Sequence, residues 1–232
     1  MKIEGSVALV TGANRGLGKA YTEALLARGA AKVYATARDA ASITDPRVVA
    51  LRLDVTDPAS VAEVAEQAKD VQLLINNAGI ATGAGVLDGD EALRREMETN
   101  YYGPVRVARA FAPILAANGG GAVVNMLSAL SWLSLPNTAG YSASKAAAWA
   151  ATNALRLALR EQGTLVTAVH VGYIDTDMAA HVDGPKVAPG DVVAQVLDAV
   201  AAGQHEVLAD DTSRRVKSGL SGDLRNMYPA LT

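Results

Sequence analysis

The amino-terminal segment places a strand, a glycine-rich turn and a helix in immediate succession. The apolar run at residues 7–10 leads directly into TGANRGLG at residues 11–18. Strong helix formers with an apolar face follow, and Gly29 ends them as a carboxyl-terminal cap. A second apolar run at residues 32–36 completes a strand-helix-strand unit, so the pattern predicts an α/β fold.

The glycines of this turn are suited to holding a phosphate. Gly12, Gly16 and Gly18 would let the backbone approach a diphosphate, and the amino terminus of the following helix would receive its charge. Their spacing is Gly-x-x-x-Gly-x-Gly, which differs from the Gly-x-Gly-x-x-Gly of the larger dinucleotide-binding dehydrogenases. Taken alone, a glycine-rich turn without a ligand is the alternative interpretation.

Short apolar runs alternate with longer helical patterns along the rest of the chain. Half of the 232 residues are apolar, enough for one large core, and Pro58 and Pro189 are suitable helix starts. The alternation predicts a single domain, residues 1–232, with a doubly wound parallel sheet of about seven strands flanked by helices. The further predicted strands span residues 48–53, 71–76, 122–126, 165–171 and 206–208, and the helices span residues 58–69, 91–118, 141–162 and 190–202.

Composition argues against several classes of function. The formal charge is −3 and no basic run occurs, so we expect neither nucleic-acid nor membrane binding. The absence of cysteine excludes disulfides and thiolate chemistry, and His170, His181 and His205 lack the spacing of metal ligands, so no required metal is expected. No run of about eighteen apolar residues occurs, which predicts a soluble, cytoplasmic protein.

Tyr141 and Lys145 form a candidate acid/base pair. They lie four residues apart, so they share one face of a helix. A phenol with a pKa of about 10 is a poor proton donor near neutrality, and a nearby ammonium is expected to lower that pKa. Alone, this pair is also common on solvated helix faces.

Further motifs follow in a fixed order: Asp54-Val55, Asn76-Asn77-Ala78-Gly79, Asn100 and Ser128. With the glycine-rich turn and the Tyr-x-x-x-Lys pair, they make the chain resemble the short-chain dehydrogenase/reductase superfamily from about residue 5 to about residue 210. The resemblance implies a Rossmann fold and hydride transfer between a nicotinamide cofactor and a carbonyl or alcohol. The chain departs from the family at Val171-Gly172, where Pro-Gly is usual, so the rigidity of that turn is in question.

The resemblance also implies the catalytic roles. Tyr141 would donate the proton, Lys145 would lower the pKa of the phenol and bind the nicotinamide ribose, and Ser128 would hold the carbonyl oxygen. Ser131 and Ser134 are nearby competitors, but only Ser128 directly follows a predicted strand. Asn100 would anchor a water that passes protons to the lysine, and its alternative role is a helix-interior asparagine bonded to backbone.

The cofactor contacts implied by the resemblance lie in several loops. Asp54 and Val55 match the adenine side, although Asp54 is also suited to bonding its own backbone. Asn76 is interpreted as stabilising the sheet. The predicted cofactor-binding residues are Gly12, Asn14, Arg15, Gly16, Leu17, Gly18, Arg38, Asp54, Val55, Asn77, Ala78, Gly79, Tyr141, Lys145, Ile174 and Thr176.

The end of the second predicted strand favours NADPH over NADH. Enzymes that use NADH usually have a carboxylate there, which binds the ribose hydroxyls and repels a 2′-phosphate. Here Ala37 takes that position, and Arg38 and Arg15 are predicted to converge on the phosphate. Asp39 is the objection, because a small shift of the loop would bring it to the ribose, so NADH remains the alternative cofactor.

The predicted function is an NADP(H)-dependent carbonyl reductase or alcohol dehydrogenase acting on a small molecule. The alternatives are a reductase of 3-oxoacyl thioesters on a carrier protein and a non-catalytic dinucleotide-binding regulator. The segment at residues 177–186 is short for a lid, so we expect an open pocket with an apolar wall. That wall would include Trp132, Leu133, Leu135, Tyr173 and Met178.

Two further predictions concern assembly and the end of the chain. The helices at residues 91–118 and 141–162 are rich in small apolar residues around much of their circumference, which predicts a homo-oligomer, a tetramer or a dimer. Alanine is also the best helix former, so a monomer is the alternative. The tail after Asp210 either covers the site or frays, and its composition favours fraying.

Overall fold

The computed structural model describes residues 1–228 of the chain. Seven parallel strands form one sheet in the order β3-β2-β1-β4-β5-β6-β7, which confirms the predicted doubly wound architecture. The predicted single domain, residues 1–232, includes residues 229–232, which lie outside the described residues. The strands are β1 (Val7–Thr11), β2 (Lys32–Ala37), β3 (Val49–Arg52), β4 (Leu73–Asn76), β5 (Gly121–Met126), β6 (Thr164–His170) and β7 (Glu206–Leu208).

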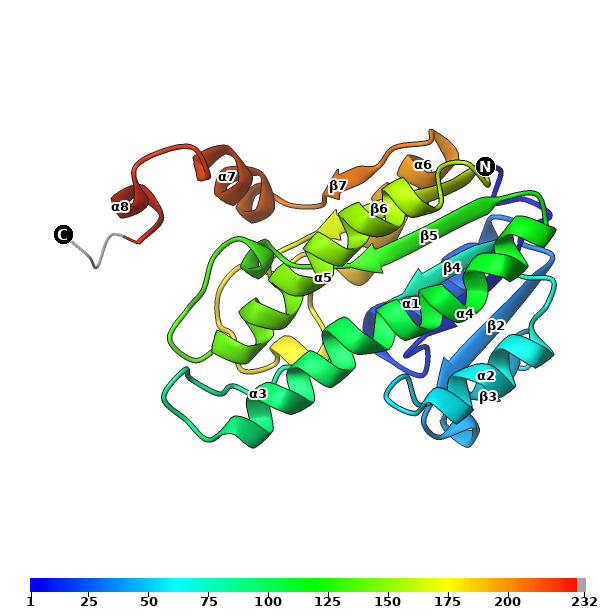
Figure 1. Ribbon diagram of the computed structural model, residues 1–232, viewed down its shortest axis with the longest axis horizontal. Helices are drawn as coiled ribbons and strands as arrows, with labels where there is room; N and C mark the ends of the chain where they lie inside the picture. The colour runs from blue at the N-terminus through cyan, green and yellow to red at the C-terminus, as the bar shows by residue number, and fades with distance from the viewer. Residues whose placement is uncertain (229–232) are drawn as a thin grey trace.

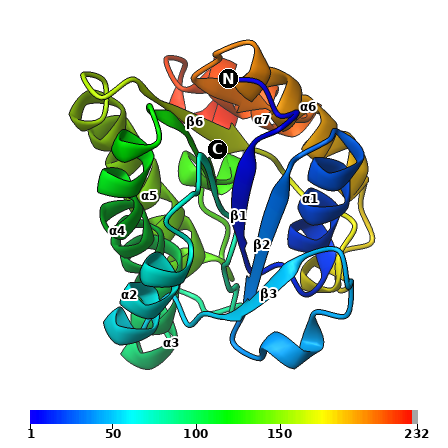
Figure 2. The ribbon, with the colours of Figure 1, turned by 90° about the vertical axis from the view of Figure 1, so that its right-hand side faces the viewer.

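Helices cover both faces of the sheet (Figure 2). One layer contains α1 (Gly16–Ala27) and α6 (Pro189–Ala201), which pack against each other. The other layer contains α2 (Pro58–Gln67), α4 (Gly103–Ala117) and α5 (Ala139–Ala158). Alternate residues of the central strand β1 supply the two cores, because Ala8 and Val10 face α1 and α6 while Leu9 faces the opposite layer.

The predicted long helix at residues 91–118 is wrong as a single regular helix. Its first part is α3 (Asp90–Met97), a π turn follows at Glu98–Tyr102, and only then does α4 begin. Pro104 has no backbone N–H and cannot donate to the carbonyl of Asn100 four residues earlier, so one α-helical bond is missing and a wider turn is favoured. The π turn therefore surrounds a predicted site residue.

The segment after Asp210 is folded, which contradicts the predicted fraying of its described part. It forms α7 (Asp211–Gly219) and the short α8 (Leu224–Met227), which lie at one end of the molecule (Figure 1). Asp210 caps α7, because its Oδ1 accepts from Ser213 N at 2.8 Å. The hydroxyl of Tyr228 accepts from Ser134 N at 3.0 Å, so the tail contacts the loop that follows β5.

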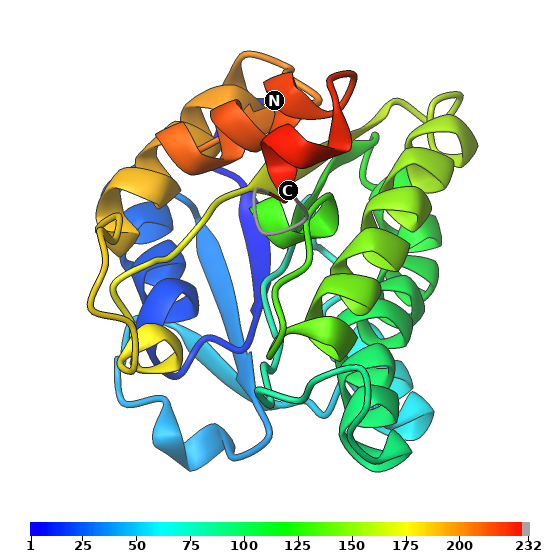
Figure 3. The ribbon, with the colours of Figure 1, turned by 90° about the vertical axis from the view of Figure 1, so that its left-hand side faces the viewer.

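Seen from the carboxyl ends of the strands, the two helical layers are parted over the middle of the sheet (Figure 3). The sheet order reverses between β1 and β4, where the chain crosses from one side to the other. In open α/β sheets the loops at such a point form the ligand site. Half of the predicted site residues lie in the loops after β1, β4, β5 and β6: Gly12, Asn14, Arg15, Asn77, Ala78, Gly79, Ser128, Ile174 and Thr176.

Candidate active site

The turn after β1 is shaped for close backbone approach. Gly12 has φ of +66°, a conformation that residues with a side chain rarely adopt. A Cβ added at Gly18 would overlap the carbonyl oxygen of Gly12, so the first turn of α1 packs directly on the loop. Gly16 is the first residue of α1, and Arg15 is its N-cap. Asn14 precedes the cap, and Leu17 follows Gly16 in the helix. The predicted phosphate loop is therefore a strand-turn-helix junction with its backbone uncovered.

A hydroxyl joins this turn to the end of β4. The Oγ1 of Thr11 accepts from the backbone N–H groups of Asn77 and Ala78, each at 3.0 Å. The amide of Asn77 donates to the carbonyl of Thr11 at 2.9 Å and to that of Gly12 at 3.1 Å. The sequence analysis did not assign a role to Thr11. The sequence signal for this role is a small hydroxyl residue at the last position of a strand.

The end of β2 separates Arg38 from Asp39. Ala37 is the buried last residue of the strand, and the exposed Arg38 follows it. The carboxylate of Asp39 accepts from Ala41 N at 3.0 Å and caps the 3₁₀ turn Ala40–Ser42. Among the described residues, Arg38 has no hydrogen bond or ion pair, whereas Asp39 has a local structural partner.

Arg15 pairs across the loops with Asp177. Its Nη1 lies 3.0 Å from Oδ2 of Asp177, and both side chains are largely exposed. Such exposed pairs contribute little, about 0–1 kcal/mol, and rearrange easily. The convergence of Arg15 with Arg38 on a phosphate stays a prediction.

Asp54 bonds to its own loop, which was the alternative role. Its Oδ1 accepts from the backbone N–H of Thr56 at 2.9 Å and from the Thr56 hydroxyl at 2.7 Å. Desolvation acts to raise the pKa of Asp54, but these hydrogen bonds and the charges of Arg38 and Arg52 outweigh it and hold the pKa below its ordinary value. Val55 is buried against Gly103. Asp54 therefore fixes the loop that carries Val55.

Tyr141 and Lys145 face each other from the first turns of α5. The Nζ of Lys145 lies 5.6 Å from the centre of the Tyr141 ring and donates to the carbonyl of Met126 at 2.7 Å. Burial raises the pKa of Tyr141 to about 12, although hydrogen bonding to Ser128 acts to lower it. Burial also lowers the pKa of Lys145 to about 8.

These values correct one expectation. The sequence predicts that Lys145 lowers the pKa of the phenol, but in this structure that pKa is raised, because desolvation dominates and the ammonium is bonded to Met126. The phenol is thus fully protonated at neutral pH. This is the form that a proton donor needs.

Ser128 follows β5 and is buried beside Tyr141. Its Oγ accepts from Leu130 N at 3.1 Å and donates to the carbonyl of Val171 at 3.4 Å. Its backbone N–H donates to the hydroxyl of Ser131 at 3.3 Å, which gives that competitor a structural partner. Ser134 lies further along, in contact with Tyr228. Of the three serines, Ser128 alone acts on the pKa of Tyr141.

Asn100 occupies the π turn with its side chain fully bonded. Its Oδ1 accepts from Ile80 N at 2.9 Å, and its Nδ2 donates to Ile80 O at 2.9 Å and Ser144 Oγ at 3.0 Å. The side chain therefore has the backbone-bonded role that was the alternative. A Cβ at Gly79 would lie 3.1 Å from Asn100 Oδ1 and 3.7 Å from Lys145 Nζ, so this glycine lets the two side chains approach.

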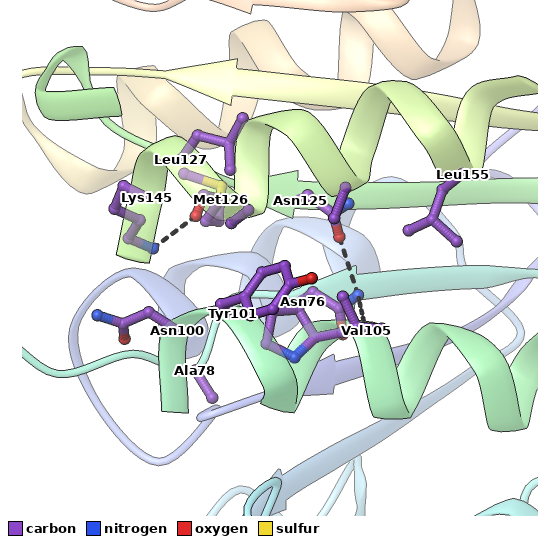
Figure 4. Close-up of a pocket in the computed structure, with 13 residues that line it drawn as sticks. Asn76, Ala78, Asn100, Tyr101, Val105, Asn125, Met126, Leu127, Lys145 and Leu155 are labelled. Atoms are coloured by element: carbon purple, nitrogen blue, oxygen red, sulfur yellow. Dashed lines mark hydrogen bonds between the residues drawn. The ribbon is translucent and has the colours of Figure 1, made fainter. Parts of the chain in front are cut away.

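A small cavity of about 10 Å³ lies beneath Lys145 between the sheet, α4 and α5 (Figure 4). Asn76 and Asn125 line it and bond to each other, Nδ2 to Oδ1, at 2.9 Å, which supports the predicted role of Asn76 in the sheet. The Oδ1 of Asn76 is buried and has no partner among the described residues. By this measure the volume is about the least that can hold one water molecule.

Glu96 is a buried carboxylate that the sequence analysis missed. Its Oε1 accepts from the backbone N–H of Thr82 at 2.6 Å and from the Thr82 hydroxyl at 2.9 Å. Its Oε2 lies against Gly140, where any Cβ would overlap it. The charge of Glu96 contributes to the raised pKa of Tyr141, after the larger effect of burial. A glutamate on an amphipathic helix reads as solvent-exposed, so periodicity gave no signal for it.

The turn after β6 is held without the usual proline. The backbone N–H of Gly172 donates to Oδ2 of Asp210 at 2.9 Å, and the carbonyl of Val171 accepts from Ala129 N at 2.9 Å. Ile174 pairs with Val187 as an isolated bridge, and Thr176 lies against Gly16. Asp210 therefore supplies from the tail some of the restraint that a proline would give. The carboxamide contacts of Ile174 and Thr176 stay predictions.

Residues 1–228 contain neither a membrane-spanning helix nor a metal site. No helix there is both long and apolar enough to cross a membrane. No group of three or more His, Cys, Asp or Glu side chains in that range is arranged to hold a metal ion.

The residues of this site fall within a match to a known protein family. Residues 6–186, which contain the glycine turn, Ser128 and the Tyr141–Lys145 pair, match the family described as short chain dehydrogenase. The chain belongs to the short-chain dehydrogenase family. As a member, it is an oxidoreductase that uses a nicotinamide dinucleotide.

Relatives within the short-chain dehydrogenases differ in substrate. The chain is 35% identical to the 3-oxoacyl-acyl-carrier-protein reductase of Escherichia coli over 189 residues, which cover 77% of each chain. It is 32% identical to the galactitol 2-dehydrogenase of Agrobacterium fabrum over 221 residues, 88% of this chain and 86% of the relative. Family membership therefore leaves the substrate open.

A short-chain dehydrogenase of Burkholderia cenocepacia, solved in complex with NADP, has the same fold throughout. It is 45% identical, the TM-score is 0.95, and the match covers 100% of this chain and 99% of the other. The glycine turn fits a dinucleotide, because a Cβ at Gly12 would press on Ala78 and one at Gly18 would overlap Gly12, so only glycine allows this close packing of the turn.

Proposed function

We propose that this short-chain dehydrogenase reduces a ketone or aldehyde to an alcohol with NADPH, and catalyses the reverse oxidation, with Tyr141 as general acid and base. The observation that carries the proposal is the convergence of Tyr141, Ser128 and Lys145 at the carboxyl end of β5. Tyr141 is protonated at neutral pH, Ser128 lies close enough to act on its pKa, and Lys145 is buried one helical turn away. The bound nicotinamide would supply or accept the hydride.

The protein's own residues would handle the proton and the oxygen. Ser128 would donate a hydrogen bond to the substrate oxygen and fix it beside the phenol of Tyr141. Tyr141 would transfer its proton to that oxygen as negative charge develops there. Lys145 would bind the ribose and stabilise the phenolate that remains, and Asn100 would hold the π turn through which a water reaches the lysine.

The cofactor contacts are proposed for the same set that the sequence indicates. The uncovered turn with Gly12, Asn14, Gly16, Leu17 and Gly18 would take the diphosphate. Asp54 and Val55 would border the adenine, Asn77, Ala78 and Gly79 would pass beside the ribose, and Ile174 and Thr176 would meet the carboxamide. Support comes from the bonds of Thr11 that hold the turn and the end of β4 together.

NADPH is proposed as the preferred cofactor because of the residues after β2. Ala37 leaves no carboxylate at the strand end, Asp39 is occupied as a cap, and Arg38 is exposed. Arg15 would leave its exposed pair with Asp177 to join Arg38 on the 2′-phosphate. The Burkholderia cenocepacia relative was solved with NADP, which supports the same preference.

Arg38→Ala should therefore lower kcat/KM for NADPH while kcat/KM for NADH changes little. A charge-assisted bond contributes about 1.5–3 kcal/mol, so the loss should be roughly 10- to 100-fold. Steady-state kinetics with both cofactors measures it. Arg47→Ala is the matched control, since Arg47 lies in the same connection but pairs with Asp45 at 2.6 Å. Equal losses with NADPH and NADH, or a wild-type preference for NADH, would overturn the assignment.

A 3-oxoacyl thioester is the second candidate substrate, favoured by the Escherichia coli relative. Exposed apolar side chains near the carboxyl ends of the strands, Leu135, Tyr173 and Met178, favour a hydrophobic carbonyl compound of either kind over a polyol. Steady-state rates with free ketones, aldehydes and a 3-oxoacyl thioester separate the candidates. A non-catalytic regulator is disfavoured, because such a protein has no need of all four residues, Ser128, Tyr141, Lys145 and Asn100.

Residues 1–232 are proposed to form one catalytic domain that assembles as a homo-oligomer, a tetramer or a dimer. Tyr102, the last residue of the π turn before α4, and Leu157, on α5, are 49% and 75% exposed, and apolar groups of this size are usually covered. Light scattering at micromolar concentration should give a mass of at least two chains. A mass of one chain at that concentration would contradict assembly through these helices.

A further inference from the structure

His170, the last residue of β6, is fully buried directly behind Ser128. Its ring stacks on the indole of Trp132, with ring centres 3.8 Å apart and planes at 16°. The indole of Trp132 in turn meets Trp149 edge to face, with centres 6.0 Å apart. Neither His170 nor the two tryptophans has a role in the chemistry proposed above.

The imidazole contacts the backbone of Ser128. The Nδ1 of His170 lies 3.1 Å from the carbonyl oxygen of Ser128, and a carbonyl only accepts, so Nδ1 bears the proton. The same carbonyl accepts from Ser131 N at 3.0 Å, so both of its lone pairs are used. The Nε2 of His170 is buried without a partner among the described residues, as expected for the unprotonated nitrogen of a neutral ring.

The aromatic stack connects this carbonyl to the helix of Tyr141 and Lys145. Trp149 lies four residues after Lys145 and eight after Tyr141 on α5, so the three side chains share one helical face. Trp132 immediately follows the 3₁₀ turn Ala129–Ser131 that Ser128 caps. Contacts between His170, Trp132 and Trp149 therefore span the distance between the strand that supports Ser128 and the helix that bears Tyr141.

We propose that His170 is a positioning residue, which aims the hydroxyl of Ser128 at the substrate oxygen by donating from Nδ1 to the Ser128 carbonyl. The inference rests on the proposed role of Ser128. The hydrogen bond fixes the peptide plane after Ser128, and Ser131 fixes the N–H before it at 3.3 Å. With both sides held, the orientation of the Ser128 side chain is set before substrate binds.

The surroundings keep the ring neutral. Burial lowers the pKa of His170 to about 4, the bond to Ser128 acts to raise it, and the positive charges of Lys217 on α7 and of Lys145 and Arg156 on α5 lower it further. Lys217 is itself paired with Glu206 on β7. His170 therefore donates from Nδ1 throughout the neutral range.

Three substitutions separate the hydrogen bond from the packing. His170→Asn places an amide N–H near the position of Nδ1, His170→Gln places it near Nε2, and His170→Phe keeps an aromatic ring on Trp132 without a donor. If the proposal is right, His170→Asn keeps most of the wild-type kcat. His170→Gln and His170→Phe should lose roughly 10- to 100-fold in kcat, while the Kd for NADPH stays at the wild-type value.

The readouts are steady-state kcat and KM, the Kd of NADPH, and the emission of tryptophan. The chain has two tryptophans, and both lie in this cluster, so their emission reports whether the stack is intact. If His170→Phe does not fold, the Asn and Gln pair decides, compared at a temperature where thermal melts show both to be folded. Equal kcat in these two variants, or a wild-type kcat in His170→Phe, would overturn the proposal.

Ser128→Ala in the same assay separates failure of the role of His170 from failure of the proposed role of Ser128. A low kcat in Ser128→Ala together with wild-type rates in the Gln and Phe variants removes only the role of His170. A wild-type kcat in Ser128→Ala contradicts the proposed role of Ser128, and with it the positioning role of His170.

Discussion

Replacing Tyr141 with phenylalanine should lower kcat by roughly 10²- to 10⁴-fold, the usual contribution of general acid catalysis. The substitution removes the proton that the alkoxide needs and leaves the turn around Gly12 and Gly18 intact. The Kd of NADPH should therefore change little. Steady-state kinetics gives kcat, and titration of cofactor fluorescence gives the Kd.

Tyr173→Phe is the matched control for this experiment. Tyr173 is a second phenol near Tyr141 and acts to raise the pKa of Tyr141, whereas Ser128 acts to lower it. Tyr173→Phe keeps the apolar ring in the proposed substrate wall and removes only this phenol, so the control should keep most of the rate. A Tyr141→Phe enzyme that retained most of its kcat, or an equal loss in Tyr173→Phe, would remove Tyr141 from the mechanism.

Lys145→Met should impair both turnover and cofactor binding, because the proposed function gives the ammonium two tasks. A group of general acid-base catalysis contributes about 10²-fold or more to the rate, and loss of a charged hydrogen bond to the ribose should weaken NADPH binding about tenfold. Lys69→Met, an exposed lysine paired with Glu66, is the control that should leave both unchanged.

The pH profile gives this prediction a second readout. Burial lowers the pKa of Lys145 to about 8, so the free enzyme loses this positive charge as the pH rises through that value. Wild-type kcat/KM should therefore fall above about pH 8. The limb should be absent in Lys145→Met. A normal Kd for NADPH in the variant would contradict the contact with the ribose.

The order of strands and helices could be predicted from the sequence because each segment has a strong local signal. Apolar runs, glycine turns and helix starts such as Asp57-Pro58 depend on neighbours in the chain, and the structure confirms the sheet they imply. The π turn at Glu98–Tyr102 could not be seen in the same way, because residues 91–118 have uninterrupted helical periodicity. The cause is the missing backbone N–H of Pro104, which the helical periodicity of the side chains does not reveal.

The site residues also differ in whether a local sequence signal marks them. Ser128, Tyr141 and Lys145 belong to short motifs, and the structure brings them to one place as the sequence predicts. Burial by distant parts of the chain decides the pKa of Tyr141. The predicted lowering of that pKa was wrong, because burial raises it. Glu96 and His170 were missed for a related reason: their partners, Thr82 and Ser128, are fixed only by the fold.

The central claim is that Tyr141 protonates a carbonyl substrate while NADPH is oxidised. The most direct test is the rate of NADPH oxidation with a panel of hydrophobic ketones, aldehydes and a 3-oxoacyl thioester, measured for wild type and Tyr141→Phe. We expect turnover of at least one carbonyl compound by the wild type, faster with NADPH than with NADH, and loss of roughly 10²-fold or more in the variant. Turnover that survives unchanged in Tyr141→Phe, or tight NADPH binding with no oxidation by any compound of the panel, would contradict it.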